Sequence, residues 1–295
     1  MILNNEHIKP YLLQNLQNKT TFIAGNAKNV GKTTFLNYLL PILRTSGKPL
    51  VYASIGVDGE DFDQITNQRK PQIVAIAGDF VVSTNKAIQN KGFQLVEAFP
   101  FNTTAGQIVM GKATRPTKVE LIGPEDNDSL ASILELIKAH HQITTVLIDG
   151  AINRITQLAS AANPVYIFVA KVDNRSVNDV MSELKRISVL NELPEWDKNL
   201  TDTLEIQGAL TEIRLKEIPA SCNSLVISDF TKIFLTLRSL LNLLQNRKVY
   251  FKNRFPMLFC VLNLKDISQQ LCEDHLNKIG FSIDVLFNPY QQYPS

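Results

Sequence analysis

Residues 20–34 read TTFIAGNAKNVGKTT, in which an apolar run leads into G-x-x-x-x-x-G-K-T, a pattern with one residue more between its glycines than the common phosphate-binding motif G-x-x-x-x-G-K-[ST]. Gly25 and Gly31 hold the two glycine positions, and glycine lets the backbone turn tightly around a bound anion. A strand before such a loop and a helix after it direct backbone amides and the positive end of the helix at that anion. The stretch therefore predicts a phosphate-binding loop, with a plain glycine-bearing turn as the alternative.

Two side chains of this loop have specific predicted roles. We expect Lys32 to contact the β and γ phosphates of a nucleoside triphosphate, ATP or GTP, and the Thr33 hydroxyl to hold Mg²⁺. The predicted nucleotide-binding residues are those of the whole loop: Gly25, Asn26, Ala27, Lys28, Asn29, Val30, Gly31, Lys32, Thr33 and Thr34.

Two carboxylates follow predicted strands. Asp149 ends the buried-looking run 145–150 (TVLIDG), and Asp58 lies in the acidic segment 56–61 after a predicted strand at 50–55. A carboxylate at the strand exits can bind Mg²⁺ or its water shell, or orient an attacking water. We predict Thr33 and Asp149 as metal-binding residues and Lys32, Asp58 and Asp149 as catalytic ones. A solvated acidic loop is the alternative for residues 56–61.

Composition places this chain of 295 residues among soluble globular proteins. It is 44% hydrophobic and has a formal net charge of +2, which is too close to neutral to indicate a nucleic-acid or membrane surface. No run is long and apolar enough to span a bilayer, and no signal-peptide pattern begins the chain. The three cysteines, Cys222, Cys260 and Cys272, lack the spacing of metal ligands, and we expect free thiols in the reducing cytoplasm. We predict no metal-binding role for His140 and His141, which end a predicted helix.

The order of predicted elements indicates an α/β fold. Apolar runs predict strands at 20–24, 50–55, 72–77, 93–98, 145–150 and 165–170, with helices predicted at 31–45, 83–89, 129–140 and 177–188. Continued strand–helix–strand winding predicts a mostly parallel sheet with helices on both faces. A polar stretch at 191–197 marks a predicted boundary between a nucleotide-binding domain, residues 1–195, and a C-terminal α/β module, residues 196–295. Whether that module extends the same sheet or packs beside it stays open.

Several weaker patterns have two interpretations. The polar loop 102–106 and the cations Arg115 and Arg154 could approach a phosphate, or could be a turn and solvated surface residues. Lys171 and Asp173 follow a predicted strand as in guanine-reading motifs, but Ala170 replaces the asparagine of those motifs, and a helix cap is the alternative. Guanine specificity therefore stays open.

The loop, the acidic exit of the second strand and Asp149-Gly150 together resemble one branch of the P-loop NTPases. That branch contains dethiobiotin synthetase, the molybdopterin guanine dinucleotide adaptor protein and chaperones of metal and cobalamin enzymes, and the resemblance covers about residues 19–190. Many of its members carry a lysine that reaches across a dimer, directly after the first glycine. Asn26 stands at that place here. Trans activation by such a lysine is therefore not expected, and a homodimer stays an open alternative.

Further stretches resemble, more distantly, bacterial proteins associated with cobalamin-dependent aminomutases. They are residues 119–124, 148–154, 208–211 and 228–234. Two functions follow from these resemblances. One is a nucleoside triphosphatase that changes shape on a partner enzyme as a chaperone, reactivase or regulator. The other is an ATP-dependent ligase or kinase of cofactor metabolism that resembles dethiobiotin synthetase. No substrate motif is legible, which favours the first.

Overall fold

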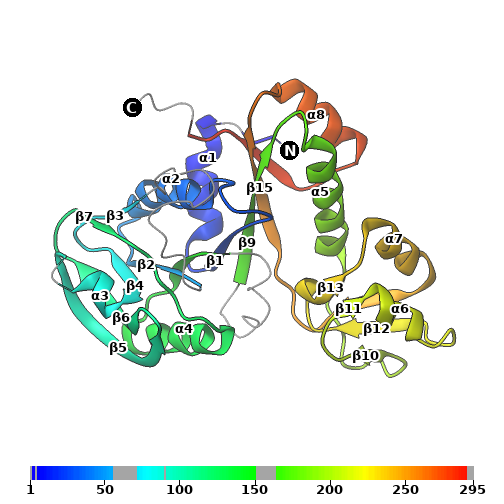
Figure 1. Ribbon diagram of the computed structural model, residues 1–295, viewed down its shortest axis with the longest axis horizontal. Helices are drawn as coiled ribbons and strands as arrows, with labels where there is room; N and C mark the ends of the chain where they lie inside the picture. Colours follow the sequence, from blue (N-terminus) through cyan, green and yellow to red (C-terminus); the bar gives the residue numbers. More distant parts are fainter. Residues whose placement is uncertain (1, 4, 56–71, 90, 151–163, 291–295) are drawn as a thin grey trace.

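A nine-stranded sheet forms the centre of the protein. The computed structural model describes residues 2–3, 5–55, 72–89, 91–150 and 164–290. In Figure 1 the larger lobe holds this sheet, and a smaller lobe lies to its right. The strands follow one another in space in the order β16 (Asp284–Phe287), β15 (Met257–Leu264), β9 (Pro164–Val172), β1 (Thr20–Gly25), β8 (Thr145–Asp149), β2 (Leu50–Ser54), β4 (Phe80–Thr84), β6 (Gly106–Ala113) and β5 (Phe93–Thr103).

Most of this sheet is parallel, which confirms the predicted α/β class. Every pair from β16 to β4 is parallel, whereas β6 pairs antiparallel with both β4 and β5. The predicted strand–helix–strand winding is therefore wrong for the segment from β3 to β6. β5 and β6 form a hairpin, because Gly106, at a φ of 135°, lets the chain turn back directly. β4 and the short α3 (Asn85–Ile88) precede this hairpin.

The strand predicted at 72–77 is shorter and lies outside the large sheet. β3 (Ile73–Ala75) pairs antiparallel with β7 (Thr117–Val119) in a two-stranded ribbon.

Helices cover both faces of the large sheet. α1 (Asn5–Leu16) and α2 (Lys32–Arg44) pack on one face, in a core that includes Ile23. α4 (Asn127–His141) and α5 (Val177–Glu192) pack on the other, in a core that includes Phe22 and Ala24. Alternate residues of β1 thus enter opposite cores, as expected for a strand buried on both sides. Pro41 does not end α2, which continues to Arg44.

The residues predicted as one C-terminal module divide between two sheets. The smaller lobe holds a separate parallel sheet of β10 (Leu204–Ile206), β12 (Ser224–Ile227) and β14 (Lys248–Phe251), the pair β11 (Leu210–Thr211) and β13 (Ile233–Phe234), and helices α6 (Glu212–Glu217) and α7 (Leu237–Asn246). β15, α8 (Gln269–Lys278) and β16 return to the large sheet beside β9. Figure 1 shows the two lobes joined through the segments around α5 and β15.

In the smaller lobe, α7 begins at Leu237. Thr236 caps it by accepting a hydrogen bond from the amide of Ser239, and β13 occupies the residues before it. None of the helices in the described part of the chain has the length and apolar character needed to cross a lipid bilayer.

Candidate functional site

The glycine-rich loop of residues 26–31 joins the carboxyl end of β1 to α2. Gly31 caps α2 with a left-handed φ of 99°, a conformation that glycine adopts without strain. A Cβ on Gly25 would lie 2.7 Å from the carbonyl oxygen of Val169 in β9, so this position has no room for a side chain. The predicted strand, loop and helix are confirmed, and both glycines are needed for the turn between them.

The loop and the start of α2 favour an anion. The amides of Lys32, Thr33 and Thr34 precede the first intrahelical hydrogen bond, which runs from the Phe35 amide to the Gly31 carbonyl at 2.9 Å. These amides add to the partial positive charge at the start of a helix, and the first turn of α2 contains no acidic residue. Lys32 Nζ donates to the Ala27 carbonyl at 2.9 Å, which folds its ammonium group back over the loop.

The carboxylate predicted to bind metal lies directly beside this loop. β8 is the parallel neighbour of β1, and the register places Asp149 opposite Ile23. Asp149 is only 6% exposed, and its Oδ2 accepts a hydrogen bond of 2.7 Å from Thr33 Oγ1. The two predicted metal-binding residues therefore meet, although they come from different elements.

The pair of oxygens has the chemistry and spacing of a magnesium site. Mg²⁺ binds oxygen ligands at about 2.1 Å in an octahedron, in which neighbouring ligands lie about 3 Å apart. Thr33 Oγ1 and Asp149 Oδ2 approximate that separation. No group of three or more His, Cys, Asp or Glu side chains among the described residues could hold a metal ion. An ion at this edge would thus take its remaining ligands from water or phosphate oxygens.

Tight backbone packing fixes the position of Asp149. Ser54 Oγ donates to its carbonyl oxygen at 3.0 Å, and the amide of Ile55 donates to the same oxygen at 3.2 Å. A Cβ on Gly123 would come within 1.7 Å of the Ser54 carbonyl oxygen, so the segment after β7 presses directly on the end of β2. The backbone at the carboxyl end of β8 is therefore held by two hydrogen bonds and by close packing against β2.

The other predicted site residues lie elsewhere or outside the description. Asp58 and Arg154 fall outside the described residues. Arg115 lies between β6 and β7, where its carbonyl accepts from the Thr117 hydroxyl at 3.1 Å. Residues 102–106 form the β5–β6 turn, and β6 is four strands away from β1. Among the described residues, neither Arg115 nor the turn at residues 102–106 has a contact with the glycine-rich loop.

Asp173 has the capping geometry that was the alternative to base recognition. Its Oδ1 accepts from the amides of Ser176 at 2.8 Å and Arg175 at 3.0 Å, just before α5. The hydrogen bonds from the amide and then the hydroxyl of Ser176 lower the pKa of its carboxyl group. This arrangement stabilises the start of α5.

Sequence analysis missed two residues that contact the loop. Asn263 ends β15, and its Nδ2 donates to the Val30 carbonyl at 2.7 Å. Tyr290 follows β16, and its hydroxyl lies 3.4 Å from the Gly31 carbonyl. A polar residue at the end of a predicted strand could have indicated Asn263, but only if the sequence had also shown that β15 belongs to the large sheet.

Comparisons of this chain with protein-family models, with curated proteins and with solved structures found no match.

Proposed function

We propose that this protein binds Mg-ATP or Mg-GTP at the glycine-rich loop and hydrolyses it, and that it acts on a partner enzyme as a P-loop chaperone, reactivase or regulator. The observation that carries the proposal is the contact of 2.7 Å between Thr33 and Asp149, made beside a glycine-capped helix start. A turn with no ligand would not require a buried carboxylate from a neighbouring strand at this point.

Each residue has a distinct task in this proposal. The amides at the start of α2 and Lys32 bind the phosphate oxygens, whose charge they neutralise. Thr33 and Asp149 hold Mg²⁺, which supplies Lewis-acid charge stabilisation at the phosphates when bound. Gly25 and Gly31 keep the loop in this shape, because a side chain on Gly25 would collide with β9 and Gly31 adopts the left-handed conformation that begins α2.

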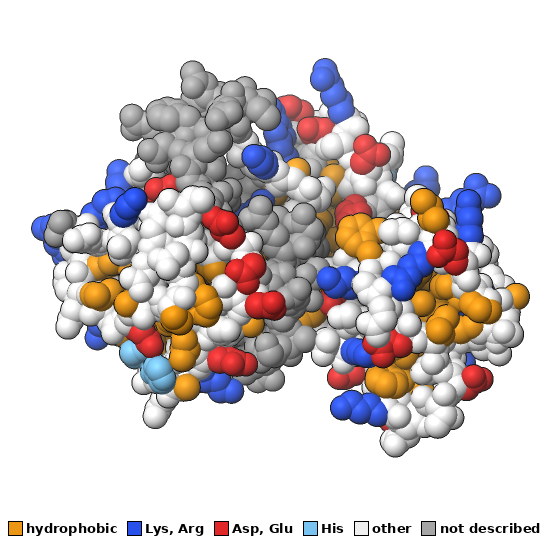
Figure 2. All heavy atoms as spheres, turned by 60° about the horizontal axis from the view of Figure 1, so that its bottom comes forward, with side chains coloured by type: hydrophobic (Ala, Val, Ile, Leu, Met, Phe, Trp, Pro, Cys, Tyr) orange, Lys and Arg blue, Asp and Glu red, His pale blue; other side chains and the backbone are white. Residues whose placement is uncertain are grey.

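Action on a partner protein is supported by the smaller lobe. Its surface carries large apolar side chains, seen in orange on the right of Figure 2. Ile213 in α6 is 73% exposed and Phe234 in β13 is 57% exposed. Exposed apolar groups of this size are common at protein–protein contact sites. The ligase or kinase alternative requires a small-molecule acceptor beside the γ phosphate, and hydrolysis assays described in the Discussion distinguish the two.

Nucleotide binding is tested by calorimetry. Mg-ATP and Mg-GTP are titrated into wild-type protein, Lys32→Ala and Lys48→Ala. Lys48 is an exposed lysine between α2 and β2, at the amino ends of the parallel strands, whereas the loop lies at their carboxyl ends. Its replacement therefore removes the same charge far from the loop. We expect Lys32→Ala to weaken binding about 10- to 100-fold, since a charged hydrogen-bond partner contributes about 1.5–3 kcal/mol. Lys48→Ala should bind as wild type, and equal affinity of all three proteins would contradict the proposal.

A further inference from the structure

The last residues of the glycine-rich loop are held from outside by the C-terminal strands. Asn263 in β15 donates to the Val30 carbonyl at 2.7 Å, and the Tyr290 hydroxyl lies 3.4 Å from the Gly31 carbonyl. The two side chains also meet, with Asn263 Nδ2 3.5 Å from the Tyr290 oxygen. More than 230 residues separate these partners from the loop in sequence. The contacts are therefore a product of the sheet order, in which β15 lies two strands from β1.

The hydrogen-bonding capacity of the two side chains matches this arrangement. A side-chain amide nitrogen has two donor hydrogens, and the Val30 carbonyl can only accept, so the nitrogen of Asn263 must face that carbonyl. Its second donor can serve the Tyr290 oxygen, whose own proton is then available to the Gly31 carbonyl. Burial raises the pKa of the Tyr290 hydroxyl, which keeps that proton in place.

The ring of Tyr290 is itself fixed by packing. It makes edge contacts with Phe35 and Tyr38 of α2, at centroid distances of 6.5 and 6.2 Å. Asn288 supports the same segment by accepting a hydrogen bond of 2.7 Å from the Leu264 amide. Asn263 leaves no space at the helix cap, since a Cβ on Gly31 would lie 2.6 Å from its Nδ2.

Holding a carbonyl group also orients the amide that shares its peptide plane. In a trans peptide the C=O and N–H bonds point in opposite directions. Anchoring the Val30 carbonyl to Asn263 therefore directs the Gly31 N–H away from β15, and anchoring the Gly31 carbonyl does the same for the Lys32 N–H. These are two of the amides that a phosphate would meet at the start of α2.

We infer that Asn263 and Tyr290 are positioning residues that preorganise the Gly31 and Lys32 amides for a phosphate chain. They do not touch the ligand. This inference rests on the proposed function for the identity of the ligand, and on the contacts above for the orientation of the loop.

The test combines two readouts on Asn263→Ala, Tyr290→Phe and a control, Tyr11→Phe. Tyr290→Phe retains the ring and removes only the hydroxyl. Tyr11 of α1 donates to Asp284 at 3.2 Å and lies 3.5 Å from the Leu258 carbonyl, at the other end of β15. Its variant therefore loses a hydroxyl that contacts the same two strands but does not contact the loop. The first readout is hydrogen exchange of the amides of residues 26–34 in protein without ligand. The second is calorimetry with Mg-ATP and with inorganic tripolyphosphate plus Mg²⁺.

We expect faster exchange in the loop for Asn263→Ala and Tyr290→Phe, with wild-type exchange in β8. Affinity for Mg-ATP should fall about five- to tenfold in Asn263→Ala and about two- to fivefold in Tyr290→Phe, as for the loss of one or two hydrogen bonds. Tripolyphosphate affinity should fall by the same factor, because the amides contact phosphates and not the base. The double variant should lose less than the sum of the two effects, since the side chains contact each other.

Wild-type affinity in both variants, with wild-type protein binding Mg-ATP, would overturn the positioning role. If wild-type protein binds neither Mg-ATP, Mg-GTP nor tripolyphosphate, the proposed function fails instead, and loop exchange alone decides the positioning role. Unchanged exchange would then overturn it, and faster exchange would support it. A general loss of stability would be recognised by faster exchange in β8 as well, and that result would also overturn it.

Discussion

Thr33 donates a hydrogen bond of 2.7 Å to Asp149 although 116 residues separate the two in sequence. The contact exists because β8 adds directly to β1 in parallel register, which places the end of β8 beside the first turn of α2. A hydroxyl and a buried carboxylate are thereby held at the spacing of two neighbouring Mg²⁺ ligands.

Replacing Asp149 should separate hydrolysis from binding. Asp149→Asn keeps the size and one oxygen of the side chain but removes its negative charge. We expect Mg²⁺-dependent hydrolysis to fall about 10²-fold or more, as when a preorganised charged group is lost, while nucleotide affinity changes less. Steady-state hydrolysis at several Mg²⁺ concentrations, together with calorimetry, measures both. Hydrolysis at the wild-type rate in Asp149→Asn would contradict the proposed role of this residue in binding Mg²⁺.

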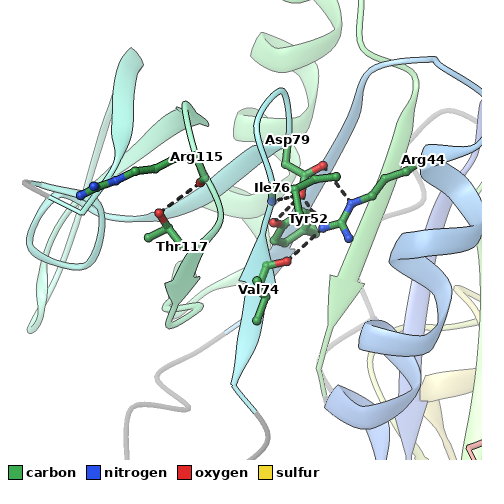
Figure 3. Close-up of polar contacts among 7 residues, drawn as sticks. All are labelled: Arg44, Tyr52, Val74, Ile76, Asp79, Arg115 and Thr117. Carbon is green, nitrogen blue, oxygen red and sulfur yellow. Dashed lines mark hydrogen bonds and ion pairs between the residues drawn. The ribbon is translucent and has the colours of Figure 1, made fainter. Parts of the chain in front are cut away.

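A second prediction concerns the Asp79 cluster that braces α2 (Figure 3). Asp79 is buried and accepts hydrogen bonds from Arg44 at the end of α2, from the Tyr52 hydroxyl at 3.1 Å and from the Ile76 amide at 2.9 Å. Arg44 also donates to the Val74 carbonyl at 3.0 Å. Burial, and then the Asp79 charge, raises the pKa of Tyr52, so its hydroxyl stays a donor.

Asp79→Ala should lower the free energy of unfolding by about 3 kcal/mol, because it removes the carboxylate that neutralises the largely buried Arg44 guanidinium and leaves the Tyr52 hydroxyl without this acceptor. Tyr52→Phe leaves Asp79 with its other donors, and should cost about 1 kcal/mol. Urea denaturation compares the two variants. An equal cost for both would show that Asp79 is not the centre of the cluster.

The carboxylate of Glu97 on β5 predicts a pH dependence of stability. It accepts from His140 Nδ1 at 2.9 Å and from His141 Nε2 at 2.7 Å, both at the end of α4. Burial by itself raises the pKa of Glu97, but the hydrogen bonds and charges of His141 and His140 outweigh it, and the net pKa lies below the ordinary value of 4.5.

A carboxyl group with a lowered pKa stabilises the folded state above its unfolded pKa, and this contribution is lost as the pH falls through the folded pKa. Glu97→Gln should therefore be less stable than wild type by about 0.5–1 kcal/mol at pH 6, and the difference should disappear as the pH falls below the folded pKa. Glu135→Gln, an exposed carboxylate on α4, is the matched control. A difference that stays constant down to pH 3 would contradict this origin.

The local features of the site could be predicted from sequence, but its long-range contacts could not. Gly25, Gly31 and the apolar run before them determine the loop by local backbone chemistry, and Asp149 was found because a strand exit in a parallel sheet lies at the ligand-binding edge. Asn263 was missed because its role depends on β15 pairing with β9 across the whole smaller lobe, residues 204–251. The hairpin of β5 and β6 was missed because an apolar run indicates a strand but not whether that strand pairs parallel or antiparallel with its neighbour.

The last prediction distinguishes a partner-directed NTPase from a ligase or kinase. An NTPase that works on a partner is useful when completion of its site depends on docking, so the isolated protein should hydrolyse ATP and GTP slowly. Asn26 stands at the position where many loops of the P-loop branch that this sequence resembles carry a lysine. Residues 26–29 are exposed, so this side of the loop is open to a group supplied from outside. A cation added to a phosphoryl-transfer site can raise the rate about 10³- to 10⁵-fold.

We therefore expect cell extract from the protein's own source to stimulate hydrolysis by wild-type protein well above its basal rate, and to leave Lys32→Ala unstimulated. Substitution of the exposed Phe234 by Ser should reduce the stimulation and leave the basal rate unchanged, because β13 lies in the smaller lobe, away from the loop. Thr104→Ala, an exposed change on the β5–β6 turn of the larger lobe, should alter neither rate. Small carboxylates and amines are assayed in parallel, with labelled phosphate followed by chromatography. Rapid transfer of the γ phosphate to one of these molecules, without extract, would replace the chaperone function by that of a ligase or kinase.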